Sequence, residues 1–453
     1  MSVVKTTKIY FLQLIIVTIL FESRYFSWYD IPAQKMRIAE NMHELFNDYI
    51  QSLETYIMFR IKETVARITP ELKEKNRAPI SLAMGAPTQN PPKFVIEAFK
   101  NALDEDGVHT YSNPKGEKFF LEACAKYMKR RFNVDLDYAT EICQLIGSKE
   151  GLANLFRGLL NPTTIDKDKE IIMIPDPGYA SYKEMIKVSG GIAYPIALTA
   201  ENNYMPDMEK VLAELVAKGL NSKKVKALVI NYPNNPLGAT ATKEYYEDIV
   251  KFCKKHNILL ISDAAYSDMY FKPELKPISI FEIEGAKDIA VEFFSFSKPY
   301  AMTGWRLGWV CGNKEAIKFF AKLKSTIDNG VMKPMQKAAA AILNSKEGNE
   351  YIEWANGEFK KRQQILVEGL KKLGWKNFHV PDATFYLWLP VPPRFKSSSE
   401  FADILLYKSG IVVVPGEGFG EYGEGFFRVS IVCSEEELYE IIRRMEEDGF
   451  FFE

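Results

Sequence analysis

The sequence has few of the residues that form disulfides or bind metals. Its 453 residues include only five cysteines, at positions 124, 143, 253, 311 and 433, and no two of them form a Cys-x-x-Cys motif. An odd number of scattered cysteines is typical of a reducing compartment, where thiols serve as small apolar side chains. There are only four histidines, and none lies at a metal-ligand spacing from another. We therefore expect no metal site, no Ser-His-Asp triad and a cytoplasmic location.

Neither sign of charge is in excess. The 58 Lys and Arg residues against 59 Asp and Glu residues give a formal net charge of −1. A nucleic-acid-binding chain carries a basic excess, so we expect no nucleic-acid partner. Hydrophobic residues make up 47% of the chain and charged residues 26%. This composition is typical of a packed globular protein and excludes a disordered, collagen-like or coiled-coil chain.

An apolar run lies near the N-terminus, at residues 9–21, and follows Lys5 and Lys8. It is shorter than the roughly 20 residues that a membrane-spanning helix needs, so we expect no stable membrane span. Its length suits a signal peptide, but no clear cleavage site follows. Three interpretations are open: a signal or weak anchor, an apolar appendage on the folded body, or a stretch upstream of a true start at Met36. We favour the start at Met36, because the unpaired cysteines argue against export.

From about residue 80, strand-like and helix-like runs alternate. Short and almost wholly apolar runs predict strands that are buried on both faces. They lie at residues 142–146, 171–174, 225–230, 258–262, 289–296 and 307–311. Amphipathic helices are expected between them, for instance at 208–219 and 243–256. The alternation predicts an α/β fold in which helices cover a mostly parallel sheet.

The pattern changes on either side of this region. Before it, residues 36–68 predict a helix that we expect Pro70 and Pro79 to end. After it, a long charged helix at about 348–373 precedes strands with a different spacing, at 384–389, 411–414 and 426–431. We therefore expect a second, smaller α+β domain. The predicted organisation is an N-terminal extension (1–60), an arm with part of the small domain (61–105), a large domain (106–330) and a small C-terminal domain (331–453).

Polar residues follow several predicted strands of the large domain. Ligands of an open parallel sheet bind outside the carboxyl ends of its strands, so these residues mark a candidate site. Lys298 comes directly after one such strand and precedes Pro299. A lysine near a buried strand end loses hydration, which lowers its pKa and makes its amine able to form a Schiff base.

The segment around this lysine, SFSKPYAMTGWRLGW at 295–309, resembles the lysine segment of fold-type-I pyridoxal-phosphate enzymes, specifically the class I/II aminotransferases. The resemblance extends from about Ile80 to the C-terminus and includes GSKE at 147–150, DPGY at 176–179 and NNPLG at 234–238. It implies the fold of aspartate aminotransferase, with pyridoxal 5'-phosphate as cofactor. The implied activity moves an amino group from an amino acid to a 2-oxo acid such as 2-oxoglutarate. Lys298 then resembles the lysine that binds the cofactor and shuttles the proton.

The resemblance implies roles for other residues around the cofactor. Asp263 matches the carboxylate that keeps the ring nitrogen protonated. Tyr266 and Asn235 match the donors to the phenolic oxygen, and Tyr179 matches the aromatic side chain that stacks on the ring. A phosphate needs basic side chains and a helix N-terminus. The residues that resemble the phosphate ligands are Ser148, Lys149, Ser295, Ser297 and Arg306.

Another phosphate contact is implied to come from a second subunit. Tyr111, in HTYSNPKG, resembles the tyrosine that the neighbouring subunit contributes to the phosphate. The resemblance therefore implies a homodimer with shared active sites. Arg428 matches the arginine that pairs with the substrate α-carboxylate, a group that Gly85 and Asn235 also approach. Because Arg428 belongs to the predicted small domain, we expect that domain to close on the substrate.

The choice of substrate depends on the segment at 325–332. Aspartate-type members commonly place a second arginine there, whereas this chain reads STIDNGVM. Asn329 looks similar to an asparagine of LL-diaminopimelate aminotransferases that contacts the substrate from the partner subunit. Aspartate, alanine or aromatic aminotransferases stay open, as do carbon–sulfur lyases and aminocyclopropane-forming synthases of the same fold. A cofactor-binding transcriptional regulator is disfavoured, because residues 1–79 are too short and too weakly basic for a DNA-binding module.

Overall fold

The computed structural model describes residues 45–453 apart from 56 and 164, in two units that end and begin at Glu54 and Thr55. In the first unit, the side chain of Asn47 caps the short helix α3 (Asp48–Gln51). The interpretations of residues 9–21 and of Met36 as a start lie outside the described residues. The second unit, residues 55–453, contains the sheets and the cavity.

Helix α4 (Ile57–Glu74) differs from the helix predicted at 36–68. The described part of that stretch is not one helix, because α3 ends at Gln51 and α4 begins only at Ile57. Pro70 lies inside α4, so the prediction that it ends the helix is wrong. Proline removes one backbone hydrogen bond from a helix. However, Ile68 and Leu72 on either side of it are buried in the core, and their packing holds the helix together.

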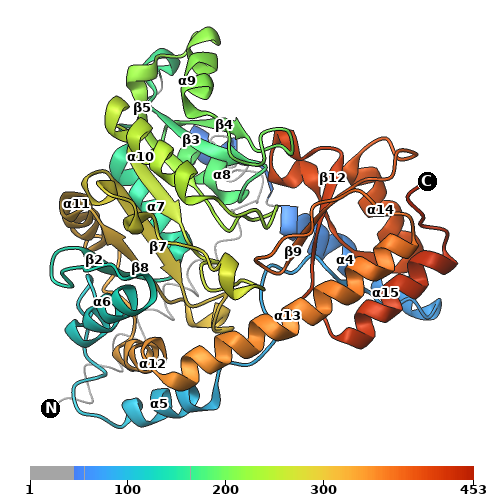
Figure 1. Ribbon diagram of the computed structural model, residues 1–453, viewed down its shortest axis with the longest axis horizontal. Coiled ribbons are helices and arrows are strands. Elements are labelled where there is room, and N and C mark those ends of the chain that lie inside the picture. Colours follow the sequence, from blue (N-terminus) through green and yellow to red (C-terminus); the bar gives the residue numbers. More distant parts are fainter. Residues whose placement is uncertain (1–44, 56, 164) are drawn as a thin grey trace, which may run out of the picture. The chain divides into compact units, whose positions relative to one another are not determined.

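A seven-stranded sheet forms the centre of the larger part of this unit (Figure 1). Its strands, in spatial order, are β2 (Ile142–Leu145), β8 (Gly308–Gly312), β7 (Ala290–Ser295), β6 (Leu259–Asp263), β5 (Val225–Ile230), β3 (Ile171–Asp176) and β4 (Ile192–Ala197). Strand β8 runs antiparallel to both of its neighbours, and the other pairs are parallel. The predicted mostly parallel sheet is therefore confirmed. Strand β4 was not predicted because Pro195 interrupts its pattern; proline is tolerated there because β4 is an edge strand.

Helices cover both faces of this sheet. Along β3, Ile171 and Met173 join one core cluster while Ile172 and Ile174 join another, because successive side chains point to opposite faces. One cluster packs against α7 (Ser148–Leu159), α8 (Ser181–Val188) and α11 (Lys314–Lys324). The other packs against α6 (Lys118–Phe132), α9 (Met208–Ala217), α10 (Lys243–His256) and α12 (Lys333–Leu343). Helix α12 also packs against α5 (Lys93–Leu103).

A smaller antiparallel sheet follows in the C-terminal part, with the order β11 (Val414–Pro415), β12 (Phe426–Ser430) and β9 (Tyr386–Pro390). It shares a separate core cluster with α14 (Ser398–Ser409) and α15 (Glu435–Glu447). Strand β1 (Ile80–Ser81) pairs with β10 (Ile411–Val412), so the chain before the large sheet also reaches this part.

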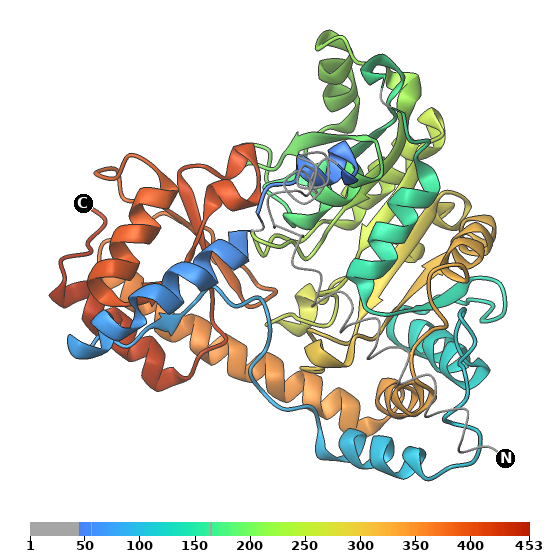
Figure 2. The same ribbon diagram turned by 180° about the vertical axis from the view of Figure 1, so that it is seen from behind.

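The long helix α13 (Lys346–Lys372) runs from the end of α12 to the smaller sheet, as Figures 1 and 2 show from opposite sides. Its early residue Ile352 belongs to a core cluster of the large sheet, and its later residue Phe359 belongs to the cluster of the small sheet. The helix thus connects two cores. The domain limits given above remain a prediction.

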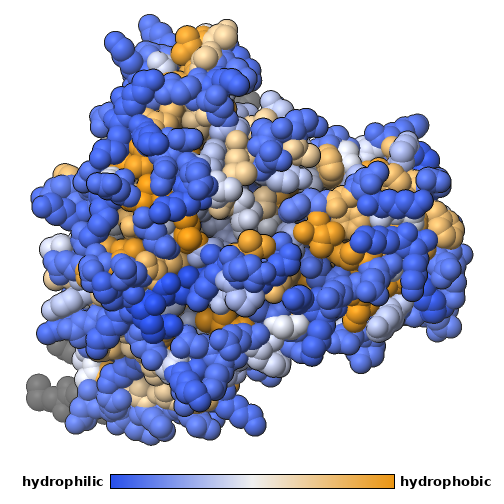
Figure 3. All heavy atoms as spheres, in the orientation of Figure 1, coloured by the Kyte–Doolittle hydropathy of each residue, from blue (hydrophilic) through white to orange (hydrophobic). Residues whose placement is uncertain are grey.

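The surface seen in Figure 3 is mostly hydrophilic, and many of the hydrophobic side chains are buried in the cores. Hydrophilic residues cover most of the face shown in Figure 3, and hydrophobic residues appear between them in small groups. Among residues 45–453, with the two gaps named above, no helix combines the length and the apolar character that a membrane crossing needs.

Candidate active site

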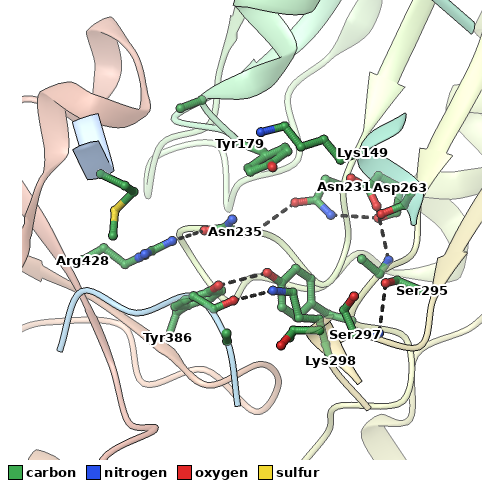
Figure 4. A pocket seen from close by; sticks show the side chains of 18 of the residues that line it. Lys149, Tyr179, Asn231, Asn235, Asp263, Ser295, Ser297, Lys298, Tyr386 and Arg428 are labelled. Carbon is green, nitrogen blue, oxygen red and sulfur yellow. Dashed lines mark hydrogen bonds between the residues drawn. The ribbon is translucent and has the colours of Figure 1, made fainter. Parts of the chain in front are cut away.

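A cavity of about 540 Å³ lies where the carboxyl ends of β6 and β7 face the small sheet. This volume is in the range of sites that bind small molecules and cofactors. Its walls also include the start of α7, the first turn of α4 and part of β12. Most of the predicted site residues line it, and Figure 4 shows several of them pointing into the same space. Those that line it are Gly85, Ser148, Lys149, Tyr179, Asn235, Asp263, Tyr266, Ser295, Ser297, Lys298, Arg306 and Arg428.

Lys298 occupies the turn after β7 and is half-buried. Its amine donates a hydrogen bond to the backbone carbonyl of Gly85. Burial, together with the positive charges of Arg428 and Arg306, lowers the pKa of Lys298 to about 8 against the opposing effect of Asp263. A substantial fraction of this amine is therefore neutral, and nucleophilic, near physiological pH.

Asp263 ends β6 and is buried. The hydroxyl of Tyr182 donates to its carboxylate at 2.5 Å, and the backbone N–H of Ala265 donates to it at 3.3 Å. The side-chain amide of Asn231 donates to its backbone carbonyl at 2.8 Å. Burial raises the pKa of Asp263, while the hydrogen bond from Tyr182 works in the opposite direction. A cationic group brought next to this carboxylate would favour its ionised form.

Neither of the two side chains that hold Asp263 in place, Tyr182 and Asn231, was among the site residues predicted from the sequence. Asn231 is the first residue after β5, the position at which polar residues follow the other strands, so its place in the chain was a usable signal. Tyr182 gave no comparable signal, because in α8 it reads as an ordinary buried aromatic residue.

Arg428 projects from β12 on the other side of the cavity and is buried. It donates to the side-chain oxygen of Asn235 at 2.8 Å and to the carbonyl of Ala83 at 2.9 Å. Its guanidinium lies over the rings of Tyr386 and Phe419, at 4.3 and 4.8 Å from their centroids. Within the described residues no carboxylate pairs with it, and its Nε has no hydrogen-bond partner. This guanidinium can therefore take a carboxylate from a ligand.

Two tyrosines lie between the lysine and the arginine. The hydroxyls of Tyr266 and Tyr386 are 3.0 Å apart, and both rings line the cavity. Burial raises the pKa of Tyr266 well above its usual value, so this hydroxyl stays protonated and able to donate. Gly85 faces the same pair: a Cβ there would lie 2.9 Å from the Tyr386 hydroxyl, so a side chain at this position would displace it.

The part of the cavity at the start of α7 suits an anion. Helix α7 begins at Ser148, and within the described chain no side chain caps it at Gly147. A Cβ on Gly147 would lie 2.4 Å from the guanidinium of Arg306, so the glycine lets that group lie against the helix start. Ser295 and Ser297 line the same cavity, where the Ser297 backbone N–H donates to the Ser295 hydroxyl at 3.1 Å. Helix-start amides, hydroxyls and an arginine together form a phosphate-binding donor set.

Tyr111 and Asn329 do not line this cavity. The side chain of Tyr111 is 85% exposed, and Asn329 is exposed in the turn between α11 and α12. Their expected contribution to the site of a second subunit stays a prediction. In the described part of the chain, no group of three or more His, Cys, Asp or Glu side chains is arranged to hold a metal ion.

Comparisons with known proteins identify the family. The sequence profile described as "Aminotransferase class I and II" matches residues 77–445. The chain belongs to the class I and II aminotransferase family. LL-diaminopimelate aminotransferase 2 of Trichormus variabilis is 42% identical to this aminotransferase over 371 residues, which cover 82% of this chain and 91% of the relative. LL-diaminopimelate aminotransferase of Aquifex aeolicus is 39% identical over 400 residues, covering 88% and 98%.

The solved structures agree on the fold. Substrate-bound BacF from Bacillus subtilis superimposes on the aminotransferase with a TM-score of 0.81 at 32% identity, covering 89% of this chain and 97% of that one. The predictions of the family, of the fold and of a transaminase activity are thus confirmed. Enzymes of this family use pyridoxal phosphate, and the cavity of this aminotransferase offers a matching set of groups: an amine, a buried carboxylate and an anion site.

Proposed function

We propose that this aminotransferase binds pyridoxal 5'-phosphate in the cavity and transfers an amino group from LL-diaminopimelate to 2-oxoglutarate. The observation that carries the proposal is the arrangement of three charged groups around one space. An amine of lowered pKa, Lys298, lines the same cavity as the buried carboxylate of Asp263 and the buried guanidinium of Arg428, and both of these charges act on it. The amine would bind the aldehyde carbon of the cofactor, and the carboxylate would bind its protonated ring nitrogen. The guanidinium would bind the carboxylate of the substrate.

Each end of the cofactor has residues that would hold it. Asp263, fixed by Tyr182, would accept a hydrogen bond from the protonated ring nitrogen. Tyr266 and the amide of Asn235 would donate to the phenolic oxygen. Because Arg428 already binds the oxygen of Asn235, the amide nitrogen of Asn235 stays available for this contact. Tyr179 would stack on the ring, and the residues that would bind the phosphate are Ser148, Lys149, Ser295, Ser297, Arg306 and the partner's Tyr111.

The reaction then rests on what this chain's residues do to the substrate. When bound, the cofactor supplies an electron sink for negative charge at the substrate Cα. Arg428 pairs with the α-carboxylate and so orients the Cα proton. The neutral amine of Lys298 would accept that proton as a base, and the protonated amine would then serve as the acid that delivers it. A pKa of about 8 places this amine near the pH at which a group can act as both base and acid.

The donor is inferred from the far end of the substrate. Relatives with 42% and 39% identity are named LL-diaminopimelate aminotransferases. The segment at 325–332 has no arginine and presents Asn329. A neutral amide can accept from an ammonium group and donate to a carboxylate, so it tolerates a zwitterionic far end. An arginine there would repel the ammonium group.

The proposed function also includes a homodimer in the cytoplasm. The high exposure of Tyr111 supports a role outside its own cavity, in the site of a second copy. All five cysteines are buried free thiols, which supports a reducing compartment.

A donor panel tests the function. Purified protein loaded with cofactor is mixed with LL-diaminopimelate, aspartate, alanine or phenylalanine, and the absorbance band is followed as the aldehyde form becomes the amine form. We expect the fastest conversion with LL-diaminopimelate and recovery of the aldehyde form on adding 2-oxoglutarate. Lys298→Ala protein is the control for conversion without the lysine. A tenfold preference for aspartate or alanine would contradict the donor, and release of ammonia with pyruvate would identify a lyase.

A further inference from the structure

Helix α12 begins at the end of one exposed loop, and its side chains form hydrogen bonds with a second loop. The residues before it, 328–332, include Asn329, and the second loop, 105–117, includes Tyr111. Lys333 in its first turn donates to the carbonyl of Gly107 at 3.0 Å and to the hydroxyl of Thr110 at 2.7 Å. The loops that carry Tyr111 and Asn329 are therefore attached to the same helix, α12.

Gln336 is the buried member of this attachment, and its side chain is 0% exposed. Its amide nitrogen donates to the hydroxyl of Ser112 at 2.8 Å and to the carbonyl of Val331 at 2.7 Å. Its amide oxygen accepts from the backbone N–H of Glu117 at 2.9 Å. Both donors of the amide are used, one for each loop, in a place that water does not reach.

Gln144, on β2, also connects the two loops, and its side chain is as buried as that of Gln336. Its amide nitrogen donates to the carbonyl of Pro114 at 3.2 Å, and its oxygen accepts from the N–H of Val331 at 3.3 Å. The two loops also touch directly. A Cβ on Gly330, whose φ is +81°, would lie 2.8 Å from the carbonyl oxygen of Asn113.

The loop with Asn329 is fixed at its other side as well. Asp328 pairs with the fully buried Lys324 at 2.7 Å, and Lys324 also reaches Glu150 of α7 at 3.2 Å. The backbone N–H of Gly330 donates to Asp328 at 2.7 Å. Asn329 thus sits between two anchored neighbours, and its position follows that of the anchors.

We propose that Gln336 is a positioning residue that holds the loop of Tyr111 and the loop of Asn329 as one unit. Both side chains then reach the active site of a second copy of this chain in a fixed relation to each other. The inference rests on the proposed function, which gives Tyr111 and Asn329 their roles in that site. Gln336 itself touches neither cofactor nor substrate, because it is buried away from the cavity among the loops.

A double-mutant cycle on cofactor binding tests the inference. The cofactor dissociation constant is measured by titrating apoenzyme, for wild type, Tyr111→Phe, Gln336→Met and the double variant. Loss of the Tyr111 hydroxyl removes a hydrogen bond to a charged group, so we expect about tenfold to a hundredfold weaker binding. Gln336→Met should weaken binding by at least about threefold alone and by less than about twofold in the Tyr111→Phe background, since residues in one network are not additive.

The donor provides a second readout. Gln336→Met should lower kcat/KM for LL-diaminopimelate more than for alanine, whose side chain has no far end for Asn329 to contact. Gln144→Met, which loosens the same two loops from a different strand, should change both readouts in the same direction. Gln363→Met is the matched control, because Gln363 is also buried and donates to the carbonyl of Pro381 at 2.8 Å, but joins neither loop.

The outcomes separate this inference from the proposed function. If Tyr111→Phe leaves cofactor binding unchanged, the role of Tyr111 in the proposed function is wrong. If Tyr111→Phe weakens binding while the effect of Gln336→Met is fully additive with it, or equals that of Gln363→Met, the positioning role is refuted. Should Gln336→Met fail to fold, the same cycle with Gln144→Met decides between coupling and additivity.

Discussion

The lowered pKa of Lys298 makes the cofactor-free enzyme selectively reactive toward small aldehydes. At pH 7, a lysine with a pKa of about 8 is neutral in roughly one molecule in ten, whereas one with the usual value of 10.5 is neutral in about three in ten thousand. The neutral amine is the nucleophile, so Lys298 should react up to ~300-fold faster than its ordinary pKa would allow. The advantage should disappear as the pH approaches 10.5, where every lysine becomes substantially neutral.

The causes of the shift predict how variants change it. Burial is the largest cause, followed by the charges of Arg428 and Arg306, while Asp263 acts in the opposite direction. Removing a positive charge with Arg428→Gln should raise the reaction midpoint, because the protonated amine is then less disfavoured. Asp263→Asn should lower the midpoint for the converse reason. Both midpoints should stay below 10.5, since burial persists in both variants.

The assay is reductive methylation of the apoenzyme with formaldehyde at a series of pH values, read out peptide by peptide by mass spectrometry. Solvent-exposed lysines in the same digest serve as the internal reference for reagent and pH. A midpoint near 10.5 for Lys298, or a shift of both variants in one direction, would refute the reasoning about burial and charge.

Three further predictions concern the cofactor, the dimer and the donor. Asp263→Asn should keep the cofactor but slow turnover by several orders of magnitude, because an amide cannot hold the ring nitrogen protonated; near-normal turnover would assign that contact to another residue. Mixing Tyr111→Phe with Lys298→Ala homodimers should restore up to about half of the sites, since one site of the hybrid carries both changes and the other none; no recovery after verified subunit exchange would contradict a shared site. Asn329→Arg should lower kcat/KM for LL-diaminopimelate by about one to two decades more than for aspartate, the equivalent of one lost hydrogen bond to a charged group; equal losses would argue against a contact at the far end.

The groups at the strand ends were predictable because a parallel sheet gathers them by geometry. Asp263 and Lys298 follow buried apolar strands, and the carboxyl ends of such strands meet at one edge. Their partners were less accessible to this reasoning. The hydrogen bond from Tyr182 to Asp263 joins residues 81 positions apart, and a buried aromatic residue in a helix carries no sign of which carboxylate it faces.

Two features of the fold depend on packing or topology and not on the local sequence alone: the helix that contains Pro70 and the direction of strand β8. Pro70 is a helix-breaking residue by its chemistry, yet the burial of its neighbours Ile68 and Leu72 keeps α4 intact. Strand β8 runs antiparallel because no helix lies between it and β7, only a short irregular segment with one turn of 3₁₀ helix. Parallel neighbours need a long crossover connection, which that segment does not provide.

Arg428 shows how the site relates stability to function. A buried charge without a counter-ion costs free energy, and here two hydrogen bonds and two aromatic faces offset only part of that cost. The same charge disfavours the protonated form of Lys298 across the cavity. A substrate carboxylate that binds Arg428 satisfies its free donor and cancels this repulsion, which raises the proton affinity of the lysine amine. Binding the carboxylate therefore both orients the substrate and makes Lys298 a stronger base at the moment when a proton has to be removed.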